Sequence, residues 1–447
     1  MAARPSSRAD GFYQVATPKR RRGHLGGASV DIFSRLAEAF EKIYVFTRFM
    51  MDSAGRHGRF ELAFYAMCLI LSLFWSLPTQ GILDFSSFYG SGEAAALGEN
   101  PYAIHDRTFS LQTAWFSGYN FNLNPPTVLP LFEGFAAFEI AQSYWGWWSI
   151  SIVLGIALLR LLKVHYGDAM PTVAIVWCIA LGSFWDTLHL GQIYIPLAFC
   201  AALAWISLRR RRRRLLAGVL IGVVAAVKPN FLVWPVVLLL AGHIAPAMAA
   251  FASFLGLVAI SLGLYGGETW AQWFDLLASE GARDVFPTNG SVGGFLHRIG
   301  LGAFGVWASL GLLAATGGWA LWRRPPVMLA SAVGLLVSLL ASPIGWAHYF
   351  LLAVPIMIEL WDRRGWTGRF ASMALAVPLV LVVISPPDVL ALRVTVGSLY
   401  FWTFLAVFAL VARHGAALDL SPAQTRKRGP RGLGPRAAGQ PVERPTV

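Results

Sequence analysis

About twelve apolar stretches follow one another along this chain of 447 residues, and most approach the length that spans a lipid bilayer. A transmembrane α-helix needs about 20 consecutive, mainly apolar residues. A soluble domain does not contain so many apolar stretches of this length. We therefore predict an all-α polytopic membrane protein with about 12 transmembrane helices. The stretches are 60–79, 127–142, 145–162, 171–187, 191–208, 215–245, 247–265, 304–322, 327–341, 349–361, 370–385 and 394–412.

Composition favours the same class. Hydrophobic residues make up 56% of the chain and charged residues 13%, whereas a soluble protein carries about 25% charged residues. The net charge of +13 could indicate nucleic-acid binding, but the positive charges lie in the two ends of the chain and in short loops. The positive-inside rule distributes Lys and Arg in this way, so we expect no nucleic-acid partner. Cys68, Cys178 and Cys200 lie inside apolar runs and are interpreted as buried apolar side chains.

The chain divides into four parts. Residues 1–29 are rich in Arg, Ser and Gly and lack an early apolar core, which predicts a disordered cytoplasmic tail and no cleaved signal peptide. Residues 30–55 carry apolar residues at helical spacing with charges between them, which predicts an amphipathic interfacial helix. Residues 60–412 form the transmembrane domain, and 413–447 form a second disordered cytoplasmic tail. We expect a monomer, because one chain can build the whole site.

Charge orders the spans across the membrane. The six arginines Arg209 to Arg214 mark the cytoplasmic side, and with the N-terminus inside, residues 80–126 lie outside. An odd number of crossings must then return the chain to Arg209, yet four apolar stretches intervene. We assign 127–142 as the stretch that does not cross, because it is short and begins with a double proline, and interpret it as a helix partly embedded from outside. The alternative is that a later stretch is re-entrant.

The apolar stretch 215–245 is interrupted by Lys228-Pro229-Asn230. Both of its flanks are predicted to be cytoplasmic, so it is interpreted as a hairpin of two short helices with Lys228 at the outer tip. Short helices broken by proline tend to line a cavity rather than face lipid. Four segments then share the outer side: 80–126, 186–192, 266–303 and 342–348.

Polar residues in an otherwise apolar chain gather on this predicted outer side. Ionisable groups near bilayer depth are costly, and are candidates for function by default. Each also has an ordinary alternative role, such as capping a helix end, snorkelling to the surface, or hydrogen-bonding a neighbouring backbone. The candidates are Asp84, Asp186, His189, Gln192, Lys228, Asn289, Ser291, His297, Arg298 and His348.

Motifs of soluble enzymes are missing from the sequence: it contains no P-loop, no G-x-S-x-G elbow and no H-E-x-x-H. Three functional classes are considered at this point. A lipid-linked sugar flippase would need a polar path through to the cytoplasmic side. A membrane acyl- or phosphotransferase would need a His–Asp pair on adjacent helical turns or a metal-binding cluster of carboxylates, and neither stands out in the sequence. A non-catalytic assembly subunit would show no activity when purified alone.

Short motifs in a fixed order support a resemblance. Asp84 is followed by Y-G-S-G-E-A-A-A-L-G-E-N-P-Y (89–102), and the later motifs are F-N-L-N-P-P (121–126), G-Q-I-Y (191–194), A-V-K-P (226–229), the Asn, Ser and Arg of 289–298, and S-P-I-G-W-A-H-Y (342–349). Together they resemble glycosyltransferase family 87, of the C-type membrane superfamily that uses polyprenyl-phosphate sugars. Its best-known members are mycobacterial mannosyltransferases that act on phosphatidylinositol mannosides.

The resemblance implies a reaction and roles for residues. A hexose, with mannose as the expected sugar, would move from a polyprenyl-phosphate donor to a lipid or glycan acceptor, with inversion. Asp84 would be the catalytic base and His348 its assistant, while Lys228 and Arg298 would meet the donor phosphate. Substrate binding would also involve Gln192, Asn289, Ser291, Tyr89 and Asp186. No cofactor or metal is expected. The enzyme would lie in the bacterial cytoplasmic (inner) membrane, with its active site facing outward.

Overall fold

The computed structural model describes residues 56–76, 83–279 and 285–419. The predicted tail 1–29, the predicted interfacial helix 30–55 and residues 420–447 therefore lie outside the described residues. Helical structure continues to Asp419, past the boundary at 413 that we predicted for the C-terminal tail. Contacts group the described residues from His57 onward as one compact unit, to which the description below is confined.

Apolar helices dominate the described residues. Six segments are long and apolar enough to cross a membrane: Gly58–Trp75, Ile140–Ala169, Thr172–Leu190, Ile244–Ser279, Gly302–Arg323 and Leu390–Leu418. Four shorter apolar helices accompany them: Tyr194–Leu208, Pro229–Leu240, Val327–Leu340 and Ala347–Glu359. The predicted class, a helical multi-pass membrane protein, is confirmed, while the count of about 12 spans stays a prediction.

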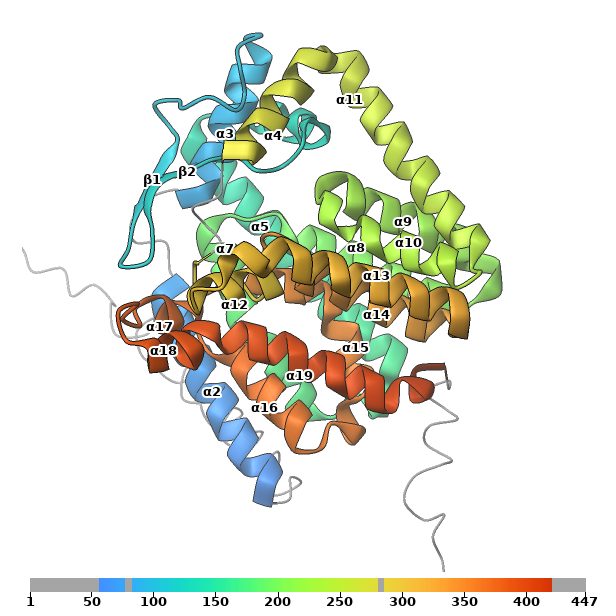
Figure 1. Ribbon diagram of the computed structural model, residues 1–447. Helices are drawn as coiled ribbons and strands as arrows, with labels where there is room; N and C mark the ends of the chain where they lie inside the picture. Colours follow the sequence, from blue (N-terminus) through green and yellow to red (C-terminus); the bar gives the residue numbers. More distant parts are fainter. Residues whose placement is uncertain (1–55, 77–82, 280–284, 420–447) are drawn as a thin grey trace, which may run out of the picture. The chain divides into compact units, whose positions relative to one another are not determined.

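The helices vary widely in length (Figure 1). In chain order they are α2 (Arg56–Ser76), α3 (Leu83–Ala96), α4 (Leu129–Ala136), α5 (Ile140–Tyr166), α6 (Thr172–Ala180), α7 (Gly182–Leu190), α8 (Tyr194–Leu208), α9 (Arg214–Val227), α10 (Val233–Leu240), α11 (Ile244–Ser279), α12 (Val292–Arg298), α13 (Gly305–Arg323), α14 (Val327–Leu340), α15 (Val354–Glu359), α16 (Gly365–Ala376), α17 (Leu379–Val383), α18 (Leu390–Val394) and α19 (Leu399–His414). Short 3-10 segments join several of them, including η4 (Pro229–Leu232) and η7 (Ala347–Ala353).

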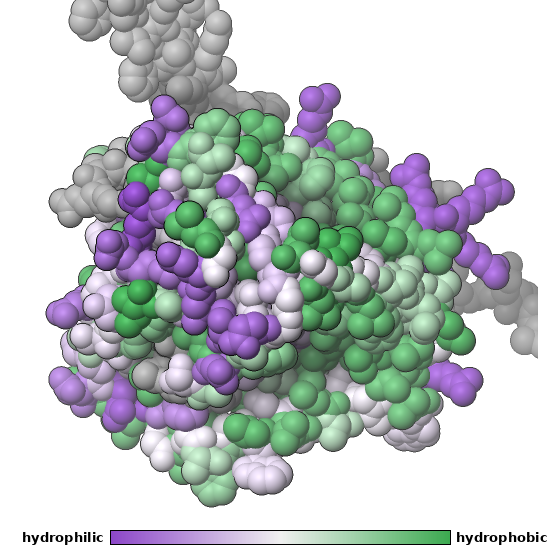
Figure 2. All heavy atoms as spheres, turned by 90° about the horizontal axis from the view of Figure 1, so that it is seen from above, coloured by the Kyte–Doolittle hydropathy of each residue, from purple (hydrophilic) through white to green (hydrophobic). Residues whose placement is uncertain are grey.

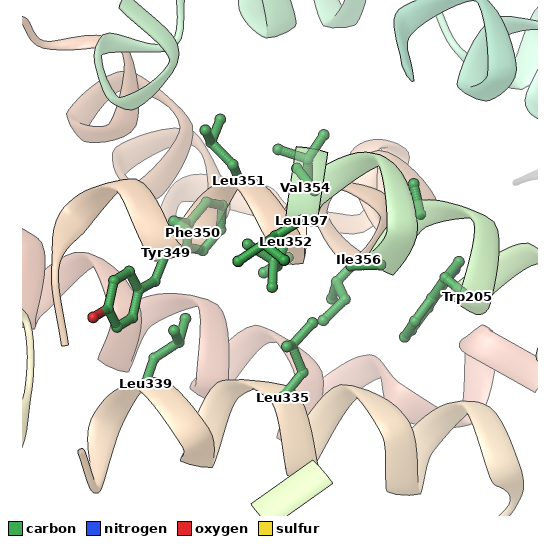
Figure 3. Close-up of a cluster of buried hydrophobic side chains, with 14 of the residues drawn as sticks. Leu197, Trp205, Leu335, Leu339, Tyr349, Phe350, Leu351, Leu352, Val354 and Ile356 are labelled. Atoms are coloured by element: carbon green, nitrogen blue, oxygen red, sulfur yellow. The ribbon is translucent and has the colours of Figure 1, made fainter. Parts of the chain in front are cut away.

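The core lies where α8 and α14 meet η7 and α15. Figure 3 shows Leu197 and Trp205 of α8 facing the same space as Leu335 and Ile356, and all four side chains are almost fully buried. Every residue of α14 except Leu329 is buried, so this helix is enclosed by protein rather than by lipid. Apolar side chains on other helices point outward instead; Trp322 is 80% exposed and Phe74 is 75% exposed. Such side chains need lipid around them.

Glycines bring α9 and α11 into close contact. A Cβ atom built on Gly218 would lie 2.2 Å from the carbonyl oxygen of Pro246, and one on Gly222 would lie 2.3 Å from that of Ala250. Small residues spaced by four let two helices approach closely in a membrane. The pair of glycines therefore fixes α9 against α11, and with it the position of the residue that ends α9.

The predicted break within 215–245 is confirmed. Helix α9 ends at Val227, Lys228 adopts an extended conformation with φ −136° and ψ 93°, and Pro229 starts η4. Proline lacks the backbone N–H that would continue the helix, and disfavours helical geometry in the residue before it. The stretch 127–142 likewise contains only a short helix, α4, before α5 begins at Ile140. The depth of α4 in the membrane stays a prediction.

A small antiparallel hairpin in the first long loop was not predicted. Strands β1 (Phe109–Gln112) and β2 (Ser117–Asn120) pair with Phe109 opposite Asn120. The Thr113 hydroxyl accepts hydrogen bonds from the backbone N–H groups of Trp115 and Phe116, which closes the turn. Figure 2 shows hydrophilic side chains gathered over the left of the view, the side on which Figure 1 places this hairpin, and a mostly hydrophobic surface across the right.

Candidate active site

One cavity of about 580 Å³ collects residues from all four segments predicted to share the outer side. Its polar lining comes from α3, β2, α7 and the turns that follow α7, α9 and α14, and its apolar lining combines aromatic and aliphatic side chains. The lining residues used below are Asp84, Asn120, Asp186, Gln192, Tyr194, Lys228, Phe286, Trp346, His348 and Tyr349. The cavity therefore combines a few convergent polar groups with an apolar wall, the usual composition of a ligand site.

Asp84 lies in the first turn of α3 and is only 5% exposed. Asn120 Nδ2 donates a hydrogen bond to its Oδ1, and Gln192 Nε2 donates one to its Oδ2. An ionised carboxylate only accepts hydrogen bonds, so both amides must present their NH₂ groups to it. For Gln192 this leaves Oε1 as a buried acceptor that no described donor reaches. Asp84 is thus a buried carboxylate held in place from two sides.

Lys228 supplies a cation to the same cavity. Its side chain is 7% exposed, and its Nζ lies 5.3 Å from the ring centroid of Tyr194 and 5.9 Å from that of Tyr349. Aromatic faces attract a cation at such distances. An anion bound beside Lys228 would favour its protonated form.

His348 and Asp186 form a pair across the cavity wall. His348 Nδ1 lies 3.1 Å from Asp186 Oδ2, and the imidazole stacks on Tyr194 with centroids 4.7 Å apart and 25° between the planes. Because the carboxylate accepts, Nδ1 carries the proton and Nε2 is the nitrogen left for a substrate. The two residues lie in α7 and η7, 162 positions apart, so they are not the pair on adjacent helical turns that an acyl- or phosphotransferase would need.

Asn289 and Ser291 stand beside the cavity wall, outside its lining. Asn289 Oδ1 accepts from the backbone N–H groups of Ser291 and Gly345, and its Nδ2 donates to the carbonyl of Pro343. Ser291 Oγ accepts from the N–H of Gly294 and so caps α12. These contacts join the loop 288–291 to the segment that leads into Trp346 and His348.

Arg298 is fully buried in the layer behind the cavity. Its Nε donates to Ser398 Oγ at 2.9 Å and its Nη1 donates to the carbonyl of Phe286 at 3.0 Å. Burial lowers the pKa of the guanidinium to about 9. Phe286 lines the cavity, so Arg298 supports the wall from outside.

Tyr89 also lies outside the lining. Its hydroxyl donates to the carbonyl of Phe138 at 2.8 Å, and its ring lies 5.4 Å from the guanidinium carbon of Arg107. It therefore joins α3 to the end of α4. Within the described residues, no group of three or more His, Cys, Asp or Glu side chains lies together as a metal site would require.

Sequence reasoning overlooked Asn120 and Tyr194. Tyr194 stands inside the motif G-Q-I-Y, and Asn120 directly precedes the motif F-N-L-N-P-P. The motifs could therefore have drawn attention to both residues. Their roles depend on contacts with Asp84, His348 and Lys228, which are distant along the chain.

Comparison with known proteins points to one family. The sequence model of glycosyltransferase family 87 matches residues 122–343. A Mycobacterium tuberculosis protein named polyprenol-phosphate-mannose-dependent alpha-(1-2)-phosphatidylinositol mannoside mannosyltransferase is 26% identical over 68% of this chain and 79% of its own length. A Mycolicibacterium smegmatis protein, named as the corresponding pentamannoside mannosyltransferase, is 25% identical over 75% of this chain and 86% of its own length.

Among solved structures, that of ArnT from Cupriavidus metallidurans bound to undecaprenyl phosphate aligns with 81% of this chain and 77% of its own. The TM-score is 0.32 and the identity 14%. A similarity of that degree carries no conclusion about this chain.

Proposed function

Because the chain belongs to glycosyltransferase family 87, we propose that it transfers a hexose from a polyprenyl-phosphate sugar to a hydroxyl of a lipid or glycan acceptor. Mannose is the proposed sugar, since the names of both relatives specify polyprenol-phosphate-mannose. The proposed location is the bacterial cytoplasmic membrane with the cavity open to the outer side, where charge patterning puts the four segments that line it.

One observation carries the proposal: the Asp84 carboxylate, the Lys228 ammonium and the His348 imidazole line a single cavity whose remaining wall is mostly apolar. A polyprenyl-phosphate sugar needs an apolar surface for its first isoprene units and a cation for its phosphate. Its acceptor needs a base for the attacking hydroxyl. The cavity offers each of these groups from a different element of the fold.

The proposed reaction is a single displacement. The acceptor hydroxyl oxygen attacks the anomeric carbon and forms the new glycosidic bond, while its proton passes to Asp84. The bond between the anomeric carbon and the phosphate oxygen breaks, and the electron pair leaves with the phosphate. Attack from the face opposite the leaving group inverts the anomeric centre, so a β-linked donor gives an α-linked product.

Lys228 and His348 act on the leaving group. A polyprenyl-phosphate sugar is a diester with one negative charge, and the departing polyprenyl phosphate gains a second. Cationic and hydrogen-bonding groups that are fixed in place stabilise charge as it develops in the transition state. Asp186, bonded to His348 Nδ1, keeps Nε2 directed to the substrate.

The proposal is tested with the purified full-length protein in nanodiscs. Synthetic polyprenyl-phosphate mannose, glucose, galactose and arabinose are supplied in turn, with total bacterial membrane lipid as acceptor. Release of polyprenyl phosphate together with a new glycosylated product from the mannose donor is the expected result. No product from any donor in nanodiscs, together with movement of labelled lipid-linked sugar across the membrane of proteoliposomes that contain the same protein, would replace the proposal with a flippase.

A further inference from the structure

The two carboxylate oxygens of Asp84 each accept a hydrogen bond from a side-chain amide. Asn120, which donates to Oδ1, stands 36 positions along the chain, and Gln192, which donates to Oδ2, stands 108 positions along it. The two donors come from separate elements, since Asn120 ends β2 and Gln192 follows α7 in the turn at Gly191. Two unrelated segments therefore converge on one carboxylate.

The hairpin is attached to α3 at a second point as well. The backbone N–H of Phe109, the residue opposite Asn120 in the ladder, donates to Ser87 Oγ at 2.9 Å. Ser87 is one helical turn after Asp84, so both lie on the same face of α3. At its tip, the Trp115 indole N–H donates to the carbonyl of Ser385. The hairpin is thus anchored at three places, and its position fixes where Asn120 stands.

Neither amide can take up or release a proton at working pH, so neither can be the base. What each can do is favour one orientation and one protonation state of the carboxylate it touches. Hydrogen bonds donated to a charged carboxylate stabilise the charged form. Bonds to charged groups contribute more than bonds between neutral groups.

We propose that Asn120 is a positioning residue for Asp84, acting in concert with Gln192. Through the hairpin, Asn120 holds the Oδ1 side of the carboxylate, while Gln192 holds the Oδ2 side, and together they set both the orientation and the acidity of the base. This inference rests on the proposed role of Asp84, and it assigns to the β1–β2 hairpin a part in catalysis beyond lining the cavity.

The test compares Asn120→Ala with Asn120→Asp. Alanine removes one donor, and aspartate replaces the amide by an acceptor of nearly the same shape that carries a charge like that of Asp84. A merely structural role for Asn120 predicts that the isosteric aspartate is the milder change. The positioning role predicts the reverse, because two neighbouring carboxylates cannot both ionise freely. Ser117→Ala, an exposed position on the same strand, is the matched control.

The main measurement is the pH dependence of kcat/KM for the full-length protein in nanodiscs. The acid limb is expected to move to higher pH by about one to two units in Asn120→Ala, to move further in Asn120→Asp, and to stay in place in Ser117→Ala. Gln192→Ala and Gln192→Glu should give the same order. An unmoved acid limb in both Asn120 variants, or a larger loss for alanine than for aspartate, overturns the inference.

A second measurement needs no turnover. Protein labelled with ¹³C at the aspartate carboxyl carbons is titrated by NMR, and Asp84→Asn identifies the signal of Asp84. The titration midpoint should move in the same order among the Asn120 variants. If the wild type transfers no sugar but the midpoint moves as stated, the positioning role stands and the proposed function falls. If transfer occurs and Asp84→Asn abolishes it, yet no midpoint moves, the positioning role falls and the proposed function stands.

Discussion

Replacing Lys228 with methionine removes a positive charge from the cavity wall while keeping a long, flexible side chain. Lys228 is 7% exposed and its ammonium lies beside the rings of Tyr194 and Tyr349, so it has little water to compensate for a lost partner. If it binds the donor phosphate, the variant loses a hydrogen bond between charged groups. Such a bond contributes about 1.5–3 kcal/mol, which corresponds to about 10- to 150-fold in kcat/KM.

The loss should appear in kcat as well as in KM. The phosphate carries one negative charge in the bound donor and two after departure, so Lys228 interacts more strongly with the transition state than with the ground state. Interactions of that kind raise kcat. Lys228→Arg keeps the charge and should retain more activity than Lys228→Met.

The assay follows release of polyprenyl phosphate from purified protein in nanodiscs, at several donor concentrations. Lys163→Met is the matched control, because Lys163 is the other lysine among the described residues and bonds the backbone carbonyls of Gly167 and Met170 at the end of α5. The control should match the wild type in activity. A value of kcat/KM for Lys228→Met within twofold of the wild type would refute the placement of the donor phosphate beside Lys228.

Further predictions concern the His–Asp pair and a buried ion pair. His348→Gln should lower kcat about 100-fold and Asp186→Asn about tenfold, and a double variant no slower than His348→Gln would show that Asp186 acts through His348. Glu61→Gln should destabilise the fold by about 3–5 kcal/mol, because Glu61 of α2 is buried against Arg364; an unchanged melting temperature in detergent would contradict this.

The sequence predicted the fold well where a single local rule decides the structure. Apolar length located the long helices, and the proline after Lys228 ended α9 where expected. It missed the hairpin of 109–120, because each strand has only four residues and its stability depends on contacts with Ser87 and Ser385. The buried pair of Arg364 and Glu61 was also missed, because these two residues are 303 positions apart along the chain.

The candidate site was predictable as a set of segments, and less so as a set of side chains. One cavity is lined by parts of all four segments that charge patterning assigned to the outer side. Several predicted residues also line it, including Asp84, Asp186, Gln192, Lys228 and His348. Asn289, Ser291 and Arg298 hold the surrounding loops instead. A polar residue in an outer loop can bond a nearby backbone or face a cavity, and the sequence does not distinguish these outcomes.

The most direct test of transfer by an aspartate base uses Asp84→Asn. Purified wild type, Asp84→Asn and the exposed control Asp388→Asn are each given polyprenyl-phosphate mannose labelled in the sugar, with bacterial membrane lipid as acceptor, and labelled glycolipid is quantified over time. The wild type and Asp388→Asn should form an α-mannosylated product at similar rates, and Asp84→Asn should form less than about 1% as much. Product formation by Asp84→Asn at a rate close to that of the wild type would contradict the assignment of Asp84 as the base.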